Sequence, residues 1–362
     1  MRLKLETPLC RLLGIRYPII AAGMAGGPST PELAAAVSNA GGLGTLGAAY
    51  LTPDAIREAV RRVRTLTDRP FAVNLFAASP MSQDGVRPEE IQAQLNRIRE
   101  ELGIPRVSDG PAAVPDPFAE QVQALLEEKV PVISTAFGIL PEPFMTQAKA
   151  AGAKVIAMAT TVREAEMAEQ AGCDAIVAQG TEAGGHRGTF DVALHPMGAN
   201  VGTFALVPQI ADRVSVPVIA AGGIMDGRGL VAALALGAQG VQMGTRFLTA
   251  AEAGTHAAYR QALLESSEES TVITKAFSGR PARGIMNAFL RQWDEAGLQP
   301  LAFPLQNTAT RDIRNAAAER GDAGYMSLWA GQGTRLLKAD QSAAGIVEET
   351  VRQAEALLST DE

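Results

Sequence analysis

Short apolar segments alternate with helix-like segments over residues 1–250, and this alternation restricts the possible folds more than any other feature of the chain. Thr30-Pro31 and Thr52-Pro53 have the composition of helix starts, and glycines follow several of the expected helices. The expected strands lie at 15–23, 43–47, 69–75, 130–134, 154–159, 174–179, 216–221 and 239–244. Eight strands alternating with helices predict an α/β protein with a closed (β/α)8 TIM barrel.

An open, doubly wound sheet is the alternative arrangement for the same alternation. A Gly-x-Gly-x-x-Gly spacing after the first strand would favour it, but residues 24–29 lack that spacing. Residues 251–333 break the alternation, and we expect a mostly helical insertion after strand eight that covers the active-site mouth as a lid. The barrel is expected to comprise residues 1–250 and 334–362, with the last helix returning to its wall.

Composition excludes several classes of protein. With 362 residues, 47% of them hydrophobic and 20% charged, the chain can bury a full core. The formal charge of -7 and the lack of a basic tract argue against a nucleic-acid partner. No apolar run reaches the ~18 residues of a membrane span, so we expect a cytoplasmic protein that does not enter the membrane. Monomer and homodimer both remain open.

The two cysteines of the chain, Cys10 and Cys173, cannot form a disulfide framework and lack metal-ligand spacing. They fit a reducing compartment and are expected to be buried apolar fillers. No metal site is expected.

A glycine-rich loop, residues 178–190, follows the sixth expected strand and carries His186. Its glycines allow positive φ angles or a close approach of the backbone to a ligand. The imidazole could act as a general base near neutral pH or, when protonated, stabilise an anion. An ordinary loop histidine is the alternative. His195 and His256 are expected to be structural or solvated.

Two charged neighbours of His186 each allow two interpretations. Arg187 could bind an anionic substrate or brace the loop, and Glu182 could cap its own loop rather than take part in catalysis.

Two further glycine-containing loops follow the seventh and eighth expected strands, where barrel enzymes commonly bind phosphate. The first contains Gly222 and Gly223, and the second contains Gly244 and Thr245. Their backbone N–H groups can converge on an anion, which predicts a phosphate site. The alternative is that the glycines only relieve crowding at the strand ends.

Polar groups at other strand ends narrow the choice of ligand. Asn74 ends the third expected strand and Gln179 the sixth, while Gly23 and Met24 end the first. The pyrimidine edge of an isoalloxazine ring both gives and accepts hydrogen bonds, and an amide side chain can match both roles. The combination favours a flavin, although each amide side chain alone could equally make its hydrogen bonds within its own strand end.

These residues together resemble the nitronate monooxygenase family, formerly called 2-nitropropane dioxygenases, whose members are FMN-dependent barrels. The resemblance covers residues 12–250 and resumes at 277–283 and 324–333, and the histidine loop is its most specific part. It implies that His186 faces flavin and substrate and that the turn 330–333 approaches the cofactor. The residues it assigns to FMN are Gly23, Met24, Asn74, Gln179, Gly184, Gly185, Gly222, Gly223, Gln242, Met243, Gly244, Thr245 and Gln332.

The chemistry that the resemblance implies is the oxidation of an alkyl nitronate by FMN, with O2 reoxidising the flavin. A carbonyl compound and nitrite would be the products, and His186 would orient the nitronate or deprotonate a nitroalkane. FMN-dependent enoyl-acyl-carrier-protein reductases and NADH:quinone reductases share the barrel and the histidine loop. The end of the histidine loop, residues 185–190, and the segment 277–283 favour the monooxygenase. One departure is that residues 158–161, after the fifth strand, lack a lysine that some relatives have there. A non-catalytic flavin-binding protein is the alternative of another class.

Overall fold

Eight parallel strands form one sheet in the computed structural model, which describes residues 4–79, 81–82, 85–108, 110 and 116–359. Their order is β1-β9-β8-β6-β5-β4-β3-β2. A parallel bridge between Ile20 and Leu43 joins the two ends, so the sheet closes and the predicted TIM barrel is confirmed. The strands are β1 Ile19–Ala21, β2 Gly44–Gly47, β3 Phe71–Phe76, β4 Val132–Ala136, β5 Lys154–Ala159, β6 Ala175–Gln179, β8 Val218–Ala221 and β9 Gly240–Met243.

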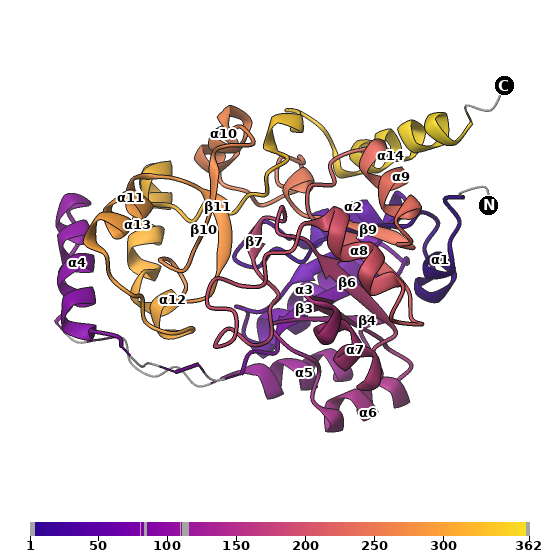
Figure 1. Cartoon of the computed structure of the whole chain (residues 1–362), viewed down its shortest axis with the longest axis horizontal. Coiled ribbons are helices and arrows are strands. Elements are labelled where there is room, and N and C mark those ends of the chain that lie inside the picture. Colours follow the sequence, from indigo (N-terminus) through magenta and orange to yellow (C-terminus); the bar gives the residue numbers. More distant parts are fainter. Residues whose placement is uncertain (1–3, 80, 83–84, 109, 111–115, 360–362) are drawn as a thin grey trace.

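Helices cover the outside of this sheet (Figure 1). Thr30 accepts a hydrogen bond from the N–H of Leu33 at 2.9 Å, and Pro31 occupies the first turn, so α2 begins where its sequence predicts. Among the described residues, no helix combines the length and the apolarity that crossing a membrane requires. The covering helices are α2 Pro31–Asn39, α3 Pro53–Leu66, α5 Phe118–Glu127, α6 Glu142–Ala150, α7 Val162–Gln170, α8 Thr203–Ala211, α9 Gly227–Ala235 and α14 Ala343–Leu358.

The barrel has two separate apolar layers because successive strand residues point to opposite faces of a sheet. In β1, Ile20 belongs to the cluster inside the barrel, whereas Ile19 packs outward against the helices. The short helix α1, Pro8–Leu13, contributes Leu9 and Leu13 to the inner cluster. The inside of the barrel is therefore a packed core, and a ligand must bind at an end of the strands.

Residues 251–333 contain four α-helices, which make up less than half of this segment, and two strands that the sequence pattern did not indicate. These strands and the histidine loop form a three-stranded antiparallel sheet, in which Ala282 pairs with His186 and Arg283 with Gly185. The elements of this part of the fold are β7 Gly185–His186, α10 Ala257–Glu265, β10 Thr271–Thr274, β11 Ala282–Ile285, α11 Ala288–Ala296, α12 Leu305–Ala309 and α13 Arg311–Arg320.

The helix α4, Pro88–Glu101, lies beside α11 and α13 rather than on the barrel wall (Figure 1). Its buried side chains share one apolar cluster with Phe289, Trp293 and Ile313. The guanidinium of Arg99 donates to the Asp312 carboxylate at 2.7 Å. In chain order α4 lies between β3 and β4, but α5, which follows it, is the helix that contacts β3.

Candidate active site

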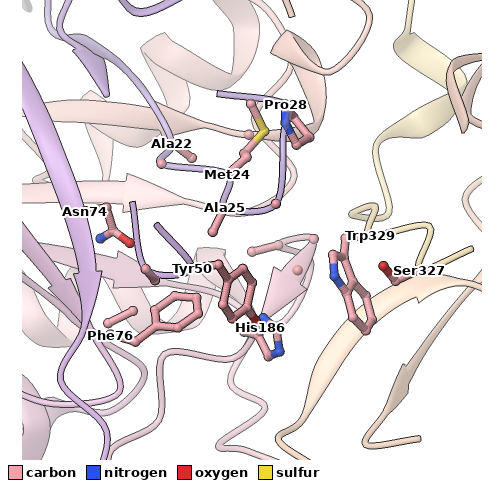
Figure 2. A pocket seen from close by; sticks show the side chains of 18 of the residues that line it. Ala22, Met24, Ala25, Pro28, Tyr50, Asn74, Phe76, His186, Ser327 and Trp329 are labelled. Carbon is pink, nitrogen blue, oxygen red and sulfur yellow. The ribbon is translucent and has the colours of Figure 1, made fainter. Parts of the chain in front are cut away.

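A cavity of about 1170 Å³ opens at the carboxyl ends of the barrel strands, and residues of the insertion line it as well. Figure 2 shows Asn74 and Phe76 from β3, His186 from β7 and Trp329 from the insertion around the same space. The volume exceeds the roughly 300–1,000 Å³ that pockets for a single drug-sized ligand occupy. The cavity therefore has room for a cofactor and a second ligand.

Nearly all site residues expected from the sequence line this one cavity. The exception is Gln332, which does not appear among the lining residues in the described part of the chain, although Gly331 and Gly333 on either side of it do. The turn still reaches the strand ends, because the N–H of Gly331 donates to Thr245 Oγ1 at 2.9 Å. The expected residues that line the cavity are Gly23, Met24, Asn74, Gln179, Gly184, Gly185, His186, Gly222, Gly223, Gln242, Met243, Gly244 and Thr245.

The histidine loop is held by the side chain of Gln179. Its Nε2 donates to the carbonyl oxygen of His186 at 3.0 Å, and its Oε1 accepts from the N–H of Gly188 at 2.8 Å. Both ends of the amide thus brace the loop, while the same side chain lines the cavity. Gln179 fixes the backbone that carries the imidazole.

Arg187 is fully buried and braces the loop from the other side. Its guanidinium donates to the carbonyl oxygens of Gly180 at 2.7 Å, Gln179 at 2.8 Å and Ala199 at 3.2 Å. Of the two interpretations that the sequence left open, the structure supports bracing, because Arg187 does not line the cavity in the described part of the chain.

Glu182 performs a similar structural task at the start of α8. Its carboxylate accepts from the N–H of Thr203 at 2.8 Å and from the Thr203 hydroxyl at 2.7 Å, which satisfies the helix start. His256 caps α10 in the same way, since its Nδ1 accepts from the N–H of Ala258 at 3.1 Å.

The imidazole of His186 lies among aromatic side chains and contacts one hydroxyl. Its ring centroid is 5.4 Å from that of Trp329, 5.5 Å from Phe137 and 5.8 Å from Phe76. Its Nε2 is 2.8 Å from Ser278 Oγ. The surrounding protein, aided by positive charge on nearby arginines, lowers the pKa of His186 to about 3. At neutral pH the ring is uncharged, and its free nitrogen can accept a hydrogen bond or, as a weak base, a proton.

The loops after β8 and β9 provide free backbone donors. In the described part of the chain, no oxygen accepts a hydrogen bond from the N–H groups of Gly223, Gly244 or Thr245. Gly222 and Gly223 have φ angles of 115° and 71°, and a Cβ on Gly222 would lie 2.7 Å from Thr203 Oγ1. These unpaired N–H groups, together with the positive φ angles that favour glycine at 222 and 223, fit a phosphate.

The part of the cavity lined by Asn74 fits a planar ring with a polar edge. Asn74 is 7% exposed and donates through Nδ2 to Ser134 Oγ at 2.9 Å, and its Oδ1 has no partner among the described residues. A Cβ on Gly184 would lie 2.4 Å from the Gly331 nitrogen, whereas one on Gly185 would meet nothing within 4 Å. The cavity thus contains a free amide oxygen at Asn74 and open space at Gly185.

Several residues of the site escaped prediction from the sequence. Phe76 had a detectable signal, because it lies two residues after Asn74 in β3 and therefore points to the same face. Ser278 belongs to a segment that the family resemblance singled out, but without a role. Tyr50 and Trp329 reach the cavity from loops, and their surroundings in the sequence carry no periodic signal.

Known proteins resemble the chain over nearly its whole length. Residues 6–353 match the protein family described as nitronate monooxygenase. A probable nitronate monooxygenase of Staphylococcus saprophyticus is 42% identical over 359 residues, which cover 99% of this chain and 100% of the relative. A protein described likewise in Staphylococcus aureus strain Newman is 46% identical over 332 residues, covering 91% of this chain and 92% of the relative.

Solved structures show the same likeness. A nitroalkane oxidase from Streptomyces ansochromogenes superposes with a TM-score of 0.89 at 38% identity, covering 96% of this chain and 98% of the other. FabK from Thermotoga maritima superposes with a TM-score of 0.76 at 33% identity, covering 98% of each chain. With its barrel, its histidine loop and these whole-length matches, the chain belongs to the nitronate monooxygenase family.

Proposed function

We propose that the protein is an FMN-dependent nitronate monooxygenase that converts alkyl nitronates and O2 into a carbonyl compound and nitrite. The observation that carries the proposal is His186 in the same cavity as a set of free backbone donors suited to phosphate. Membership of the nitronate monooxygenase family supports the same reaction.

The residues of the cavity fit FMN. Gly222, Gly223, Gly244 and Thr245 would hold its phosphate through backbone N–H groups, and Asn74 would meet the polar edge of its ring. Bound there, FMN would supply the electron acceptor for the substrate and the means of reducing O2. The other residues that we propose to contact it are Gly23, Met24, Gln179, Gly184, Gly185, Gln242, Met243 and Gln332.

His186 would act on the substrate through Nδ1, because Ser278 occupies its Nε2. With a neutral nitroalkane, the imidazole accepts the proton on the carbon next to the nitro group, and the electrons of the broken C–H bond move into that group. With a nitronate already formed, His186 only orients the anion. The aromatic rings around it make the surroundings of the imidazole apolar.

Oxygen uptake and nitrite release with propionate 3-nitronate, measured on the purified yellow protein, test this proposal. Mass analysis of the released cofactor distinguishes FMN from other flavins. Rapid NADH oxidation without any nitronate turnover would contradict the assignment.

An NAD(P)H-dependent flavin reductase of enoyl thioesters or quinones is the second candidate, favoured by a cavity larger than one cofactor needs and by the likeness to FabK. Anaerobic bleaching of the flavin by NADH or NADPH at the rate of turnover would identify it. A non-catalytic flavin-binding protein would show neither activity.

A further inference from the structure

A second cavity, of about 430 Å³, lies outside the barrel between α14 and the start of α9, two helices that pack side by side (Figure 1). Leu336 and Lys338, which precede α14, line it as well. Its volume falls within the roughly 300–1,000 Å³ of pockets that bind small molecules. Met225 lines both cavities, so the two are neighbours, but among the described residues none that we assign to the flavin or to the reaction lines the second one. It is therefore a separate candidate site.

A buried arginine forms part of the wall of this second cavity. Arg246 belongs to the short 3-10 helix η1, Thr245–Phe247, and is 3% exposed. Its Nε donates to the carbonyl oxygen of Met225 at 3.2 Å, and its Nη2 donates to Gln341 Oε1 and lies 3.5 Å from a carboxylate oxygen of Glu349. Its Nη1 is also buried but has no hydrogen-bond partner among the described residues. Because an unpaired buried donor is unfavourable, this nitrogen is suited to an acceptor on a ligand in the cavity.

Positive charge exceeds negative charge on the wall of the second cavity. Asp226 accepts from Arg228 Nε at 2.9 Å, and Glu349 forms an ion pair with Lys338, so both carboxylates already have a cationic partner. The guanidinium of Arg352 has no hydrogen-bond or ion-pair partner among the described residues. Unpaired positive charge on the wall of a cavity, in a chain whose formal charge is -7, favours an anionic ligand. The charged residues that line the cavity are Asp226, Arg228, Arg246, Lys338, Glu349 and Arg352.

Apolar side chains line the second cavity beside these charges. They are those of Met225, Leu336, Ala356 and Leu357. Leu336 is 45% exposed and Leu357 is 47% exposed, which is unusual for large apolar side chains of this protein. An aliphatic group in the cavity would remove their apolar surface from water, and this favours binding. The cavity therefore fits a ligand that combines one anionic group with an aliphatic tail.

We propose that the second cavity binds an aliphatic monocarboxylate. The carboxylate accepts a hydrogen bond from Arg246 Nη1 and is attracted by the charge of Arg352, and the aliphatic tail lies against Leu336 and Leu357. A carboxylate is the proposed anion because its planar shape matches that of a guanidinium group. The site is independent of the reaction proposed for the active-site cavity.

Octanoate, titrated into the purified full-length protein by calorimetry, tests the site. We expect its Kd to rise by about 10-fold or more in Arg246→Gln, which lacks the charged donor. In Arg352→Glu, where the charge is reversed, we expect a rise of about 5-fold or more. Arg352 is exposed and unpaired among the described residues, so this variant keeps the fold even if Arg246→Gln does not. Arg291→Glu, at an exposed helical arginine outside both cavities, is the matched control and leaves the Kd unchanged.

Two related ligands separate the contribution of the charge from that of the tail. We expect 1-octanol, which has the tail without the charge, and acetate, which has the charge without the tail, each to bind about 10-fold or more weakly than octanoate. Equal binding of 1-octanol would refute the role of the arginines, and equal binding of acetate would refute the role of the apolar wall. Absence of octanoate binding, or an octanoate Kd that Arg352→Glu leaves unchanged, would overturn the proposed site.

Discussion

Replacing Arg187 with methionine tests whether the buried brace holds the histidine loop. Methionine keeps an unbranched apolar stem but removes hydrogen bonds to three carbonyl oxygens, at 2.7, 2.8 and 3.2 Å. Each such bond to a charged group is worth ~1.5–3 kcal/mol. Each carbonyl group left without a partner costs ~1–3 kcal/mol, but removing the charge also removes the cost of burying it, so we expect a net loss of about 3–5 kcal/mol.

Thermal unfolding of the apoprotein measures this loss, which corresponds to a fall in Tm of roughly 6–10 °C at about 2 °C per kcal/mol. Flavin affinity should fall as well, because Gly180 and Gln179 carry two of the freed carbonyls next to the cavity. Arg228→Met is the control, since its ion pair with Asp226 lies on the surface and is worth less than ~1 kcal/mol. A fall in Tm no larger than that of the control, with unchanged flavin affinity, would refute the bracing role of Arg187.

Three further predictions concern His186 and Gly184, the glycine immediately before β7. His186→Ala should lower kcat by about 10²- to 10⁴-fold with neutral nitroalkanes while the flavin stays bound, which absorbance after gel filtration measures. Loss of flavin to the same extent as loss of activity would instead indicate a structural role for His186. Burial lowers the pKa of His186 to about 3, so the proposed base is already unprotonated above that pH. We therefore expect kcat/KM to stay constant down to about pH 5, and an inflection near pH 6.5 in the pH profile would contradict this. Gly184→Ala puts a Cβ 2.4 Å from the Gly331 nitrogen and should weaken flavin binding, measured as Kd in the refolded or reconstituted apoprotein, whereas unaltered Kd and Tm would show that the turn can move aside.

The barrel and the location of the site follow from the sequence because they depend on local signals. Helix starts such as Thr30-Pro31 and apolar strands such as β6 are set by a few neighbouring residues. Once the strands are parallel, their carboxyl ends meet, so Asn74, Gln179 and Gly222 are brought together although they are far apart in the chain.

The contribution of the insertion could not be predicted in the same way. β7 has two residues, too few for any periodic pattern, and its partner β11 lies about a hundred positions later in the chain. Arg187 is a charged residue in a glycine-rich loop, where solvent exposure is the usual outcome. Its burial depends on three carbonyl groups that only the folded loop assembles.

The pairing of β7 with β11 has a consequence for how substrates enter. The insertion contributes Ser278 to His186, and Arg283 donates from β11 to the carbonyl oxygen of Thr181 at 2.8 Å. Swinging the insertion away as a rigid body would break these contacts and displace the imidazole at the same time. In the proposed reaction, such a movement would therefore misalign the base, and we expect substrate to enter where the insertion is not hydrogen-bonded to the histidine loop.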